Sequence, residues 1–397
     1  MIKILRIINR FNLGGPTYNA AYLTKYMPPE YQTLLIGGVP EKSETDSLHI
    51  VKSLNIEPII IPEMSRSINP LNDLKAYMKI KKIIREYKPD IVHTHASKAG
   101  LLGRWAAAQQ KVPVIVHTFH GHVFHSYFNP LLTHLFIQTE RWLAKKTSAL
   151  IAISPQQKHE LTYQYKIAPA EKFVVIPLGL DLRKFAENKS IKREKFRQQY
   201  RIPDNLIAIG IVGRLAPIKN HQLLIDASKI LKQQTNKIFE IIIIGDGETK
   251  NQLKEYIIQS GMTYRESPQQ PPADFYFTSW IKEMDTAYAG LDIVALSSKN
   301  EGTPVSLLEA QAAGKTIIST DVGGVRDIVM EGSGYIVNDF SAETYARALH
   351  QSIENYAVQN IFVENHISPL IIEKYAYSTL VKNMDNLYKQ LLSSTRQ

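Results

Sequence analysis

Two glutamates lie eight residues apart around the start of a predicted helix. In LSSKNEGTPVSLLEAQAAGKTIIST, Glu301 follows a strand, Thr303 is a predicted N-cap and Pro304 suits the first helical position. Glu309 lies about two turns further along, and Gly314 fits just past the helix end. Free N–H groups at such a helix start bind phosphate, and carboxylates accept paired hydrogen bonds from sugar hydroxyls. An ordinary capped helix with an exposed glutamate is the alternative interpretation.

A basic pair follows another predicted strand. In GIVGRLAPIKNHQLLIDASKIL, Gly213, Arg214 and Lys219 lie in the loop between that strand and an amphipathic helix. An arginine and a lysine together can neutralise a diphosphate, and the arginine can bind it through two parallel hydrogen bonds. A surface loop held by ion pairs is the alternative.

Two glycines, Gly14 and Gly15, follow the first predicted strand and precede a helix in INRFNLGGPTYNAA. Glycine at this place lets the backbone approach a ligand closely. The signal is weak by itself, because glycine pairs also simply make turns.

Six histidines lie at or just beyond the ends of two predicted strands, in DIVHTHASKAGLLGR and VIVHTFHGHVFHSYF; they are His93, His95, His117, His120, His122 and His125. Metal ligation is one interpretation, but no acidic residue accompanies them and no H-E-x-x-H motif occurs. We expect some of them to be hydrogen-bonded core residues and at least one to line a ligand site. Neither Asp-x-Asp nor a phosphate-loop motif is present, which argues against a metal clamp and against a phosphate-loop nucleotide hydrolase.

The composition is that of a folded soluble protein. The 397 residues favour two or three domains at roughly 150 residues each, and 44% hydrophobic with 21% charged residues excludes a disordered chain. The absence of cysteine excludes disulfides and thiolate chemistry. No apolar run reaches the length of a membrane-spanning helix, and Arg6 and Arg10 interrupt the only stretch that could serve as a secretory signal, so we expect a cytoplasmic protein.

The net charge of +10 lies entirely in the first part of the chain. Residues 1–180 contain 22 Lys and Arg against 12 Asp and Glu, whereas residues 181–397 contain 25 of each. Such an asymmetry suggests that one half meets an anionic partner such as a membrane surface, a nucleic acid or a phosphorylated ligand. An unevenly placed solubility charge is the alternative.

Short apolar runs alternate with helical patterns along the chain. IKILRII, QTLLIG, EPIII, DIVHTH, PVIVHTF, ALIAIS and FVVIP predict strands of one domain, and IAIGIV, FEIIIIG, DFYFTSW, LDIVALS, TIIST and GYIV predict strands of a second. Continuous apolar strands alternating with helices indicate doubly wound parallel sheets covered on both faces. The polar stretch 181–205 between them is a predicted linker, and a predicted last helix over residues 372–392 could return to the first domain.

In this order and spacing, these motifs resemble a glycosyltransferase of the GT-B fold, most of all the retaining family 4 in its branch for bacterial cell-surface polysaccharides. The strongest motif is the Glu-x7-Glu pair in EGTPVSLLEA, and GRLAPIKN, DVGGVRDIV, PLGLD, HTHASKAGLLGR and HTFHGHVF also look like that branch. The resemblance implies two Rossmann-like domains that face a cleft: an acceptor-binding domain at residues 1–185, on which the C-terminal helix (about 372–397) could pack, and a nucleotide-sugar domain at residues 200–371.

The resemblance also implies roles for individual residues. Arg214 and Lys219 would bind the donor diphosphate, Glu301 the donor sugar and Glu309 the ribose hydroxyls. Backbone N–H groups near Thr303, Pro304 (which lacks one) and Val305 would assist, and Gly14 and Gly15 would let the first loop approach the phosphate or the acceptor. His120 matches the histidine of the catalytic site, which it would form with Glu301, Arg214 and Lys219. His95, Lys98 and Asn19 are the candidates for acceptor contacts, although the branch often has histidine at position 19.

The implied reaction is the transfer of a sugar, as in a retaining hexosyltransferase, from a nucleotide sugar, with UDP favoured, to a lipid-linked or polysaccharide-precursor acceptor. No metal or other cofactor is expected. A sugar-nucleotide epimerase of the same architecture and a non-catalytic partner that binds nucleotide sugars are the alternatives, and no nucleic-acid recognition motif is found.

We further expect the first domain to dock on the anionic inner face of the cell membrane. Phe124, Tyr127, Phe128, Leu131, Leu132, Leu135 and Phe136 recur at near-helical spacing, and Arg141, Lys145 and Lys146 follow. Aromatic and basic residues on one stretch suit an interfacial helix. Packing of this stretch in the domain core is the alternative.

Overall fold

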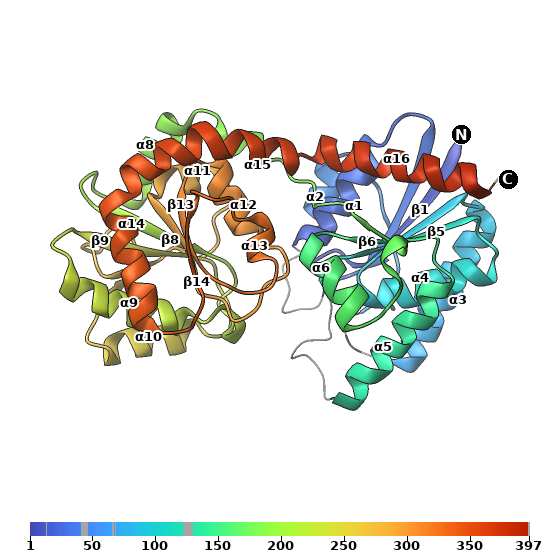
Figure 1. The fold of residues 1–397 in the computed structure, drawn as a ribbon, viewed down its shortest axis with the longest axis horizontal. Helices are drawn as coiled ribbons and strands as arrows, with labels where there is room; N and C mark the ends of the chain where they lie inside the picture. The colour runs from blue at the N-terminus through green and yellow to red at the C-terminus, as the bar shows by residue number, and fades with distance from the viewer. Residues whose placement is uncertain (13, 41–46, 66, 68, 122–129, 396–397) are drawn as a thin grey trace. The chain divides into compact units, whose positions relative to one another are not determined.

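The chain folds into two compact units, each built on its own parallel sheet (Figure 1). The computed structural model describes residues 1–397 except residues 13, 41–46, 66, 68, 122–129 and 396–397. Unit 1 comprises Met1–Leu180 and Tyr375–Gln397, and unit 2 comprises Asp181–Lys374. From the sequence we expected the first domain to end at residue 185 and the second to begin at residue 200. In the structure, residues 181–199 belong to unit 2.

Unit 1 contains a seven-stranded parallel sheet in the order β3-β2-β1-β4-β5-β6-β7. The strands are β1 (Ile2–Arg10), β2 (Tyr31–Gly38), β3 (Ile59–Ile60), β4 (Ile91–His95), β5 (Val114–Phe119), β6 (Ala149–Ala152) and β7 (Phe173–Val175). All seven coincide with apolar runs predicted as strands. These runs are continuously apolar because helices cover both faces of the sheet.

The helices of unit 1 are α1 (Gly15–Tyr26), α2 (Leu48–Ser53), α3 (Pro70–Tyr87), α4 (Ser97–Gln109), α5 (Pro130–Lys145), α6 (Pro155–His159) and α16 (Tyr377–Thr395). On one face, α3 and α4 bury Ile80 and Leu102 against Leu5 and Val92. On the other face, α16 runs along the unit, as the red helix of Figure 1 shows. Its apolar side chains, among them Met384, pack on β1, β4 and β5.

Two glycines of α4 allow this helix to lie close to the sheet. A Cβ on Gly103 would come within 2.7 Å of Thr94 Cγ2, and one on Gly100 within 2.6 Å of the His117 ring. Both distances are shorter than a van der Waals contact. The glycines of HTHASKAGLLGR are therefore packing residues.

The predicted helix over residues 372–392 is two helices. α15 (Ser368–Lys374) ends unit 2, and α16 begins at Tyr377. Between them Tyr375 O accepts a hydrogen bond from Leu180 N, and Leu180 O accepts one from Tyr377 N. The backbone of residues 375–377 pairs with Leu180 instead of continuing the helix.

Unit 2 repeats the architecture with the strand order β10-β11-β9-β8-β12-β13-β14, again all parallel. Its strands are β8 (Ile207–Val212), β9 (Phe239–Ile244), β10 (Tyr264–Arg265), β11 (Phe275–Phe277), β12 (Ile293–Leu296), β13 (Thr316–Thr320) and β14 (Gly334–Val337). Six of them were predicted. The edge strand β10 was missed, because two residues form no apolar run.

The helices of unit 2 are α7 (Arg183–Ala186), α8 (Lys189–Tyr200), α9 (His221–Gln234), α10 (Lys250–Gln259), α11 (Met284–Gly290), α12 (Val305–Ala312), α13 (Val325–Ile328), α14 (Ala342–Phe362) and α15. The linker prediction was wrong, because α7 and α8 occupy residues 183–200. Phe196 of α8 is buried where a Cβ on Gly290 would touch its ring, and Arg197 bonds Asp292 at 2.6 Å.

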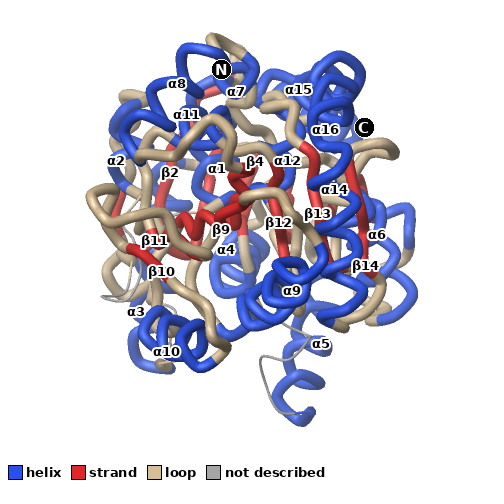
Figure 2. Tube along the Cα trace, turned by 90° about the vertical axis from the view of Figure 1, so that its left-hand side faces the viewer, coloured by secondary structure: helices blue, strands red, loops and turns tan. Residues whose placement is uncertain are grey.

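Helices and strands, coloured separately in Figure 2, account for most of the chain. Among the described residues, no helix combines the length and the apolar character needed to cross a membrane.

Candidate functional site

The loops that follow β8 and β12 lie at the place where the strand order of unit 2 reverses. β8 and β12 are neighbours, and the chain leaves them toward opposite sides of the sheet. Ligands of doubly wound sheets bind outside the carboxyl ends of the strands at such a point. The loop after β8 contains Gly213, Arg214 and a 3-10 turn at Pro217–Lys219, and the loop after β12 contains Glu301.

These two loops are joined by an ion pair between predicted site residues. Lys219 Nζ lies 2.6 Å from Glu301 Oε1, and Ser298 Oγ donates to the same carboxylate oxygen at 2.6 Å. The Lys219 and Glu301 side chains are 23% and 12% exposed. Ser297 Oγ also donates to Lys219 O at 2.9 Å. The structure thus brings together a cation and a carboxylate that are 82 positions apart in the sequence.

Arg214 has a different partner, which the sequence analysis missed. Its Nη2 lies 3.0 Å from Glu248 Oε2, and both side chains are about half exposed. Glu248 belongs to the GDGE segment after β9, whose Gly245 and Gly247 would place a Cβ within 1.9 and 2.3 Å of backbone oxygens in the β8 loop. The position of GDGE after a buried strand was the signal that could have revealed this acidic neighbour.

The helix that carries Glu309 begins one residue later than predicted. Its N-cap is Pro304, its first residue is Val305 and no side chain caps it, so the assignment of Thr303 as N-cap was wrong. Thr303 Oγ1 is buried without a hydrogen-bond partner in the described part of the chain. The first N–H groups of a helix have no carbonyl partner within it, so this helix start offers donors.

The loop before α12 is held by the glycines of DVGGVRDIV. Gly324 N donates to Gly302 O at 2.9 Å, and a Cβ on Gly323 would lie 1.7 Å from Glu301 O. Gly323 has a φ of 50°, which glycine adopts without strain. The motif therefore supports the backbone of Glu301.

Glu309 lies on α12, partly buried, and interacts with Tyr288. Burial raises the pKa of the Glu309 carboxyl to about 7, although the hydrogen bond from Tyr288 and the charge of Lys184 act in the opposite direction. Its carboxyl therefore takes up a proton at a higher pH than an exposed glutamate does.

In unit 1, the strand order reverses between β1 and β4, and histidines gather there. His95 Nδ1 lies 2.9 Å from His120 Nε2, and Arg6 Nη1 lies 2.8 Å from His93 Nδ1 and 3.4 Å from His95 Nε2. Burial lowers the pKa of His93 and of His95 well below the usual value, with a further contribution from the Arg6 charge. Burial also lowers the pKa of His120 to about 3.

The remaining histidines do not join this group. His117 is buried beside Gly100 of α4, and Thr94 Oγ1 lies 2.8 Å from its Nδ1. His122 and His125 lie outside the described residues. Within the described ranges, no group of three or more His, Cys, Asp or Glu residues is arranged to hold a metal ion.

Two of the candidates for acceptor contacts, Lys98 and Asn19, are largely buried in unit 1. Lys98 Nζ pairs with Asp73 Oδ1 at 2.8 Å and donates to Ser67 O. Asn19 is 2% exposed on α1, and its Oδ1 has no hydrogen-bond partner among the described residues.

Gly14 precedes α1 with a φ of 156°, and Gly15 has room for a Cβ.

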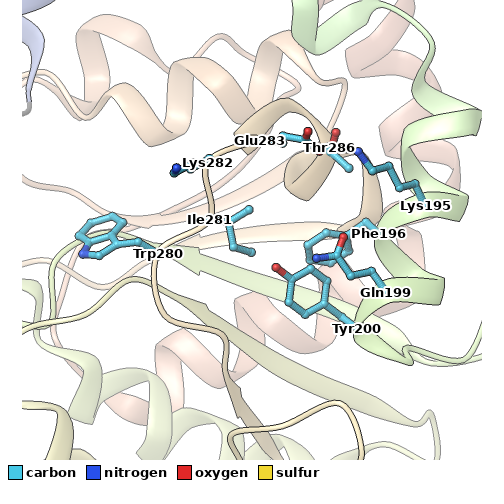
Figure 3. Close-up of a pocket in the computed structure, with 9 residues that line it drawn as sticks. All are labelled: Lys195, Phe196, Gln199, Tyr200, Trp280, Ile281, Lys282, Glu283 and Thr286. Carbon is cyan, nitrogen blue, oxygen red and sulfur yellow. Dashed lines mark hydrogen bonds and ion pairs between the residues drawn. The ribbon is translucent and has the colours of Figure 1, made fainter. Parts of the chain in front are cut away.

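A separate cavity of about 380 Å³ lies between α8 and the loop after β11. Figure 3 shows the α8 side chains on one side and the loop on the other, with Trp280 standing apart. Its lining residues are Lys195, Phe196, Gln199, Tyr200, Trp280, Ile281, Lys282, Glu283 and Thr286. None of the predicted site residues lines this cavity.

Comparison with known proteins gives the same division of the chain. Residues 18–184 match the family described as Glycosyltransferase Family 4, and residues 192–368 match Glycosyl transferases group 1. A relative in Escherichia coli, the UDP-Gal:alpha-D-GlcNAc-diphosphoundecaprenol alpha-1,3-galactosyltransferase, is 31% identical over 317 residues, which are 78% of each chain.

Solved structures show the same fold. HepE of Anabaena in complex with UDP superposes with a TM-score of 0.78 at 20% identity, over 99% of this chain and 100% of that one. A glycosyltransferase of Rickettsia africae gives a TM-score of 0.79 at 22% identity over 98% of both chains. The two doubly wound units and the matches across residues 18–368 lead to one conclusion: this chain belongs to the GT-B glycosyltransferases, with an amino-terminal region of family 4 and a carboxyl-terminal region of group 1.

Proposed function

We propose that this glycosyltransferase moves a hexose from a UDP-sugar to a lipid-linked glycan precursor, with retention of the anomeric configuration and without a divalent metal. The observation that carries the proposal is the contact of Lys219 with Glu301 beside the start of α12. The E. coli relative, named as acting on a UDP-sugar and a diphosphoundecaprenol-linked acceptor, supports the choice of substrates.

The loops of unit 2 offer the groups that a sugar diphosphate needs. Lys219 has three N–H donors, of which Glu301 takes one, so the others can bind phosphate oxygens. The α12 start and the unpartnered Thr303 hydroxyl add uncharged donors. Glu301 can accept hydrogen bonds from sugar hydroxyls through its remaining lone pairs.

Two cations suffice to neutralise the charge that develops on the leaving diphosphate. Lys219 lies at the site. Arg214 reaches it if its exposed ion pair with Glu248 breaks, and such a pair contributes only about 0–1 kcal/mol to stability. In the proposed reaction, the bond from the anomeric carbon to the diphosphate breaks and a bond to the acceptor oxygen forms on the same face. The acceptor proton passes to the departing diphosphate.

The decisive experiment is an assay of purified protein with UDP-galactose, UDP-glucose and UDP-N-acetylglucosamine against an N-acetylglucosaminyl diphosphate lipid. We expect transfer from one donor, an axial-to-equatorial H1–H2 coupling that matches the donor's anomer, and full activity in EDTA. An inverted product would refute retention. Loss of activity in EDTA that Mg²⁺ or Mn²⁺ restores would refute metal independence. Epimerised UDP-sugar formed without acceptor would replace the proposal by the epimerase alternative.

We also propose that unit 1 docks on an anionic membrane through α3, α4 and α5. Leu131 and Leu135 of α5 are 82% and 59% exposed, and α5 extends below the other labelled helices of unit 1 in Figure 1. Leu71, Leu74 and Met78 form an exposed face of α3. These side chains occupy the surface instead of the core, whereas Phe136 packs inward against unit 1. Phe124, Tyr127 and Phe128 lie outside the described residues.

Aromatic rings paired with lysines connect these apolar faces. Trp105 of α4 stacks on Tyr77 of α3 at 4.7 Å and meets Trp142 of α5 edge-on at 6.3 Å. Lys146 Nζ lies 5.2 Å above the Trp142 ring, and Lys81 Nζ lies 6.0 Å from the Tyr77 ring. Tryptophan and lysine side chains of this kind favour the boundary between lipid headgroups and acyl chains.

Liposome flotation tests the docking. We expect binding to vesicles that contain phosphatidylglycerol at low salt and its loss near ~0.5 M salt, because each basic residue contributes about 1 kcal/mol that salt screens. Leu131→Glu with Leu135→Glu should abolish binding, and Ile361→Glu, at an equally exposed site of α14, should not. Equal binding to neutral and anionic vesicles, or none to either, would refute electrostatic docking.

A further inference from the structure

Arg6 of β1 is a buried cation with no carboxylate partner among the described residues. It is 0% exposed, and its Nη1 faces His93 Nδ1 at 2.8 Å, His95 Nε2 at 3.4 Å and Tyr388 Oη at 3.4 Å. Its Nε and Nη2 have no hydrogen-bond partner among the described residues. A guanidinium has only donors and stays protonated, so a ring nitrogen that faces it must present a lone pair.

Arg6 thereby determines which ring nitrogen carries the proton in two histidines, His95 and His120. His95 Nε2 faces Arg6, so the single proton of a neutral His95 lies on Nδ1. That Nδ1 is 2.9 Å from His120 Nε2, which must then accept the hydrogen bond. The proton of His120 is therefore on its own Nδ1. This atom is buried and unpartnered in the part of the chain that the structure describes.

The opposite arrangement would be unfavourable. If His120 Nε2 carried the proton and donated to His95 Nδ1, the His95 proton would move to Nε2. Two donors would then face each other between His95 Nε2 and Arg6 Nη1. Both rings stay neutral at physiological pH, because burial holds the pKa of His95 and of His120 far below the usual value.

We propose that Arg6 is a positioning residue that fixes the tautomers of His95 and His120, so that a sugar hydroxyl that reaches His120 Nδ1 meets an N–H donor. That the ligand is a sugar rests on the proposed function. The tautomer of His120 has a chemical consequence: His120 has no free lone pair and cannot remove the proton of the acceptor hydroxyl. That proton must go to another group, such as the leaving diphosphate.

The same arginine imposes the opposite tautomer on His93. Arg6 Nη1 faces His93 Nδ1, so the His93 proton lies on Nε2, from which it donates to Thr118 Oγ1 at 2.7 Å. The structure therefore assigns Nε2–H to His93 and Nδ1–H to both His95 and His120. Because the protons are expected on Nε2 of one ring and on Nδ1 of the other two, the three tautomers together test the inference more strictly than the tautomer of one ring would.

Tautomers are read directly from long-range ¹H–¹⁵N spectra of the full-length protein labelled with ¹⁵N-histidine, recorded without any substrate at pH 7.5. His93→Gln, His95→Asn and His120→Gln each remove one set of signals and so assign it. We expect Nε2–H for His93 and Nδ1–H for His95 and His120. An Nε2–H tautomer of His120 in the wild-type protein would overturn the inference.

Variants then test whether Arg6 is the cause. Arg6→Met should leave His120 as a mixture of tautomers and lower kcat by about 10- to 100-fold, the range for one lost hydrogen bond to a reacting group, with little change in donor KM. Arg6→Lys keeps a donor-only cation and should preserve the Nδ1–H signal. Tyr388→Phe removes a hydroxyl of the same buried group, which contacts Arg6 and His93 but not His120, and should leave the His120 tautomer unchanged.

An Arg6→Met protein that keeps the pure Nδ1–H tautomer of His120 would refute the role of Arg6. If Arg6→Met does not fold, the wild-type pattern and Arg6→Lys decide the question. Because the spectra need no sugar nucleotide, a protein with the expected tautomers but no transferase activity would refute the proposed function and leave this inference standing.

Discussion

At the scale of single residues, the proposed donor site depends most on Lys219, which pairs with Glu301. Lys219→Met removes the charge but keeps the aliphatic chain that lies 3.5 Å from the Cβ position of Gly213. We expect kcat/KM to fall by about 10²–10³, the range for one lost preorganised contact to developing charge. The measurement is steady-state kinetics with the productive UDP-sugar.

Lys254→Met is the matched control for this variant. Lys254 is also in unit 2, is 21% exposed and pairs with Glu266 at 3.1 Å. It should keep wild-type kinetics and a similar melting temperature. If Lys219→Met retained half of the wild-type turnover, the role of Lys219 at the diphosphate would be wrong.

We propose that Glu309 binds the ribose hydroxyls of the donor, and its pKa, raised by burial to about 7, then predicts that donor binding depends on pH. A carboxylate accepts two hydrogen bonds from the ribose diol, whereas the protonated acid must use one oxygen as a donor. UDP affinity should therefore increase as the pH rises from 6 to 8, with an inflection that moves to lower pH when UDP is saturating. Calorimetric titration measures it. Glu309→Gln should bind more weakly and lose this dependence; a dependence that persisted in the variant would assign it to another group.

At the scale of an element, the close packing of α4 on the sheet is open to a direct test. Gly103→Ala improves intrinsic helix propensity by about 1 kcal/mol, but its Cβ would lie 2.7 Å from Thr94 and 2.9 Å from Ile7. We expect net destabilisation of about 1–3 kcal/mol, because overpacking outweighs propensity. Gly15→Ala, where the Cβ would meet Leu178 at 3.5 Å, should be nearly neutral. Urea unfolding compares the two, and equal stability would show that α4 shifts freely.

Element by element, apolar runs predicted strands well and charged helices poorly. β4 and β5 are continuous runs of buried residues, so their pattern is strong. α8 carries eight charged or amide side chains around one buried ring, Phe196, and such a pattern is also typical of a linker. The α12 boundary was misplaced by one residue, because Pro304 can serve as N-cap as well as first helical residue.

At the scale of the whole molecule, acid should destabilise unit 1 more than unit 2. Burial lowers the pKa of four histidines in unit 1: His93, His95, His117 and His120. In the unfolded chain they take up protons below about pH 6.5, before the folded state does. The stabilisation is complete above that pH and is lost as the pH falls, by up to about 1.4 kcal/mol per pH unit for each group. In unit 2, the lowered pKa of His221 also makes the folded state less stable as the pH falls. The raised pKa of Glu309 has the opposite effect, because the folded state then takes up a proton before the unfolded chain does.

The three tryptophans allow each unit to be followed by itself. Trp105 and Trp142 lie in unit 1 and Trp280 in unit 2, so Trp280→Phe makes fluorescence report unit 1 alone. Trp105→Phe with Trp142→Phe reports unit 2. Between pH 7 and pH 5, the urea midpoint should fall further for unit 1. Equal falls would show that the histidines are not neutral and buried.

Local apolar runs and turns in the sequence predicted every described strand except β10, the doubly wound class and the residues that end the predicted strands. The sequence identified Lys219 and Glu301 separately, and it took Arg6 only as a charge within an apolar strand. The tertiary structure decided that Lys219 meets Glu301, that Glu248 takes Arg214, and that Arg6 faces His93 and His95. Those contacts depend on which strands are neighbours and on the register between them. Crossover connections determine both, and the strands concerned are more than 30 residues apart in the sequence.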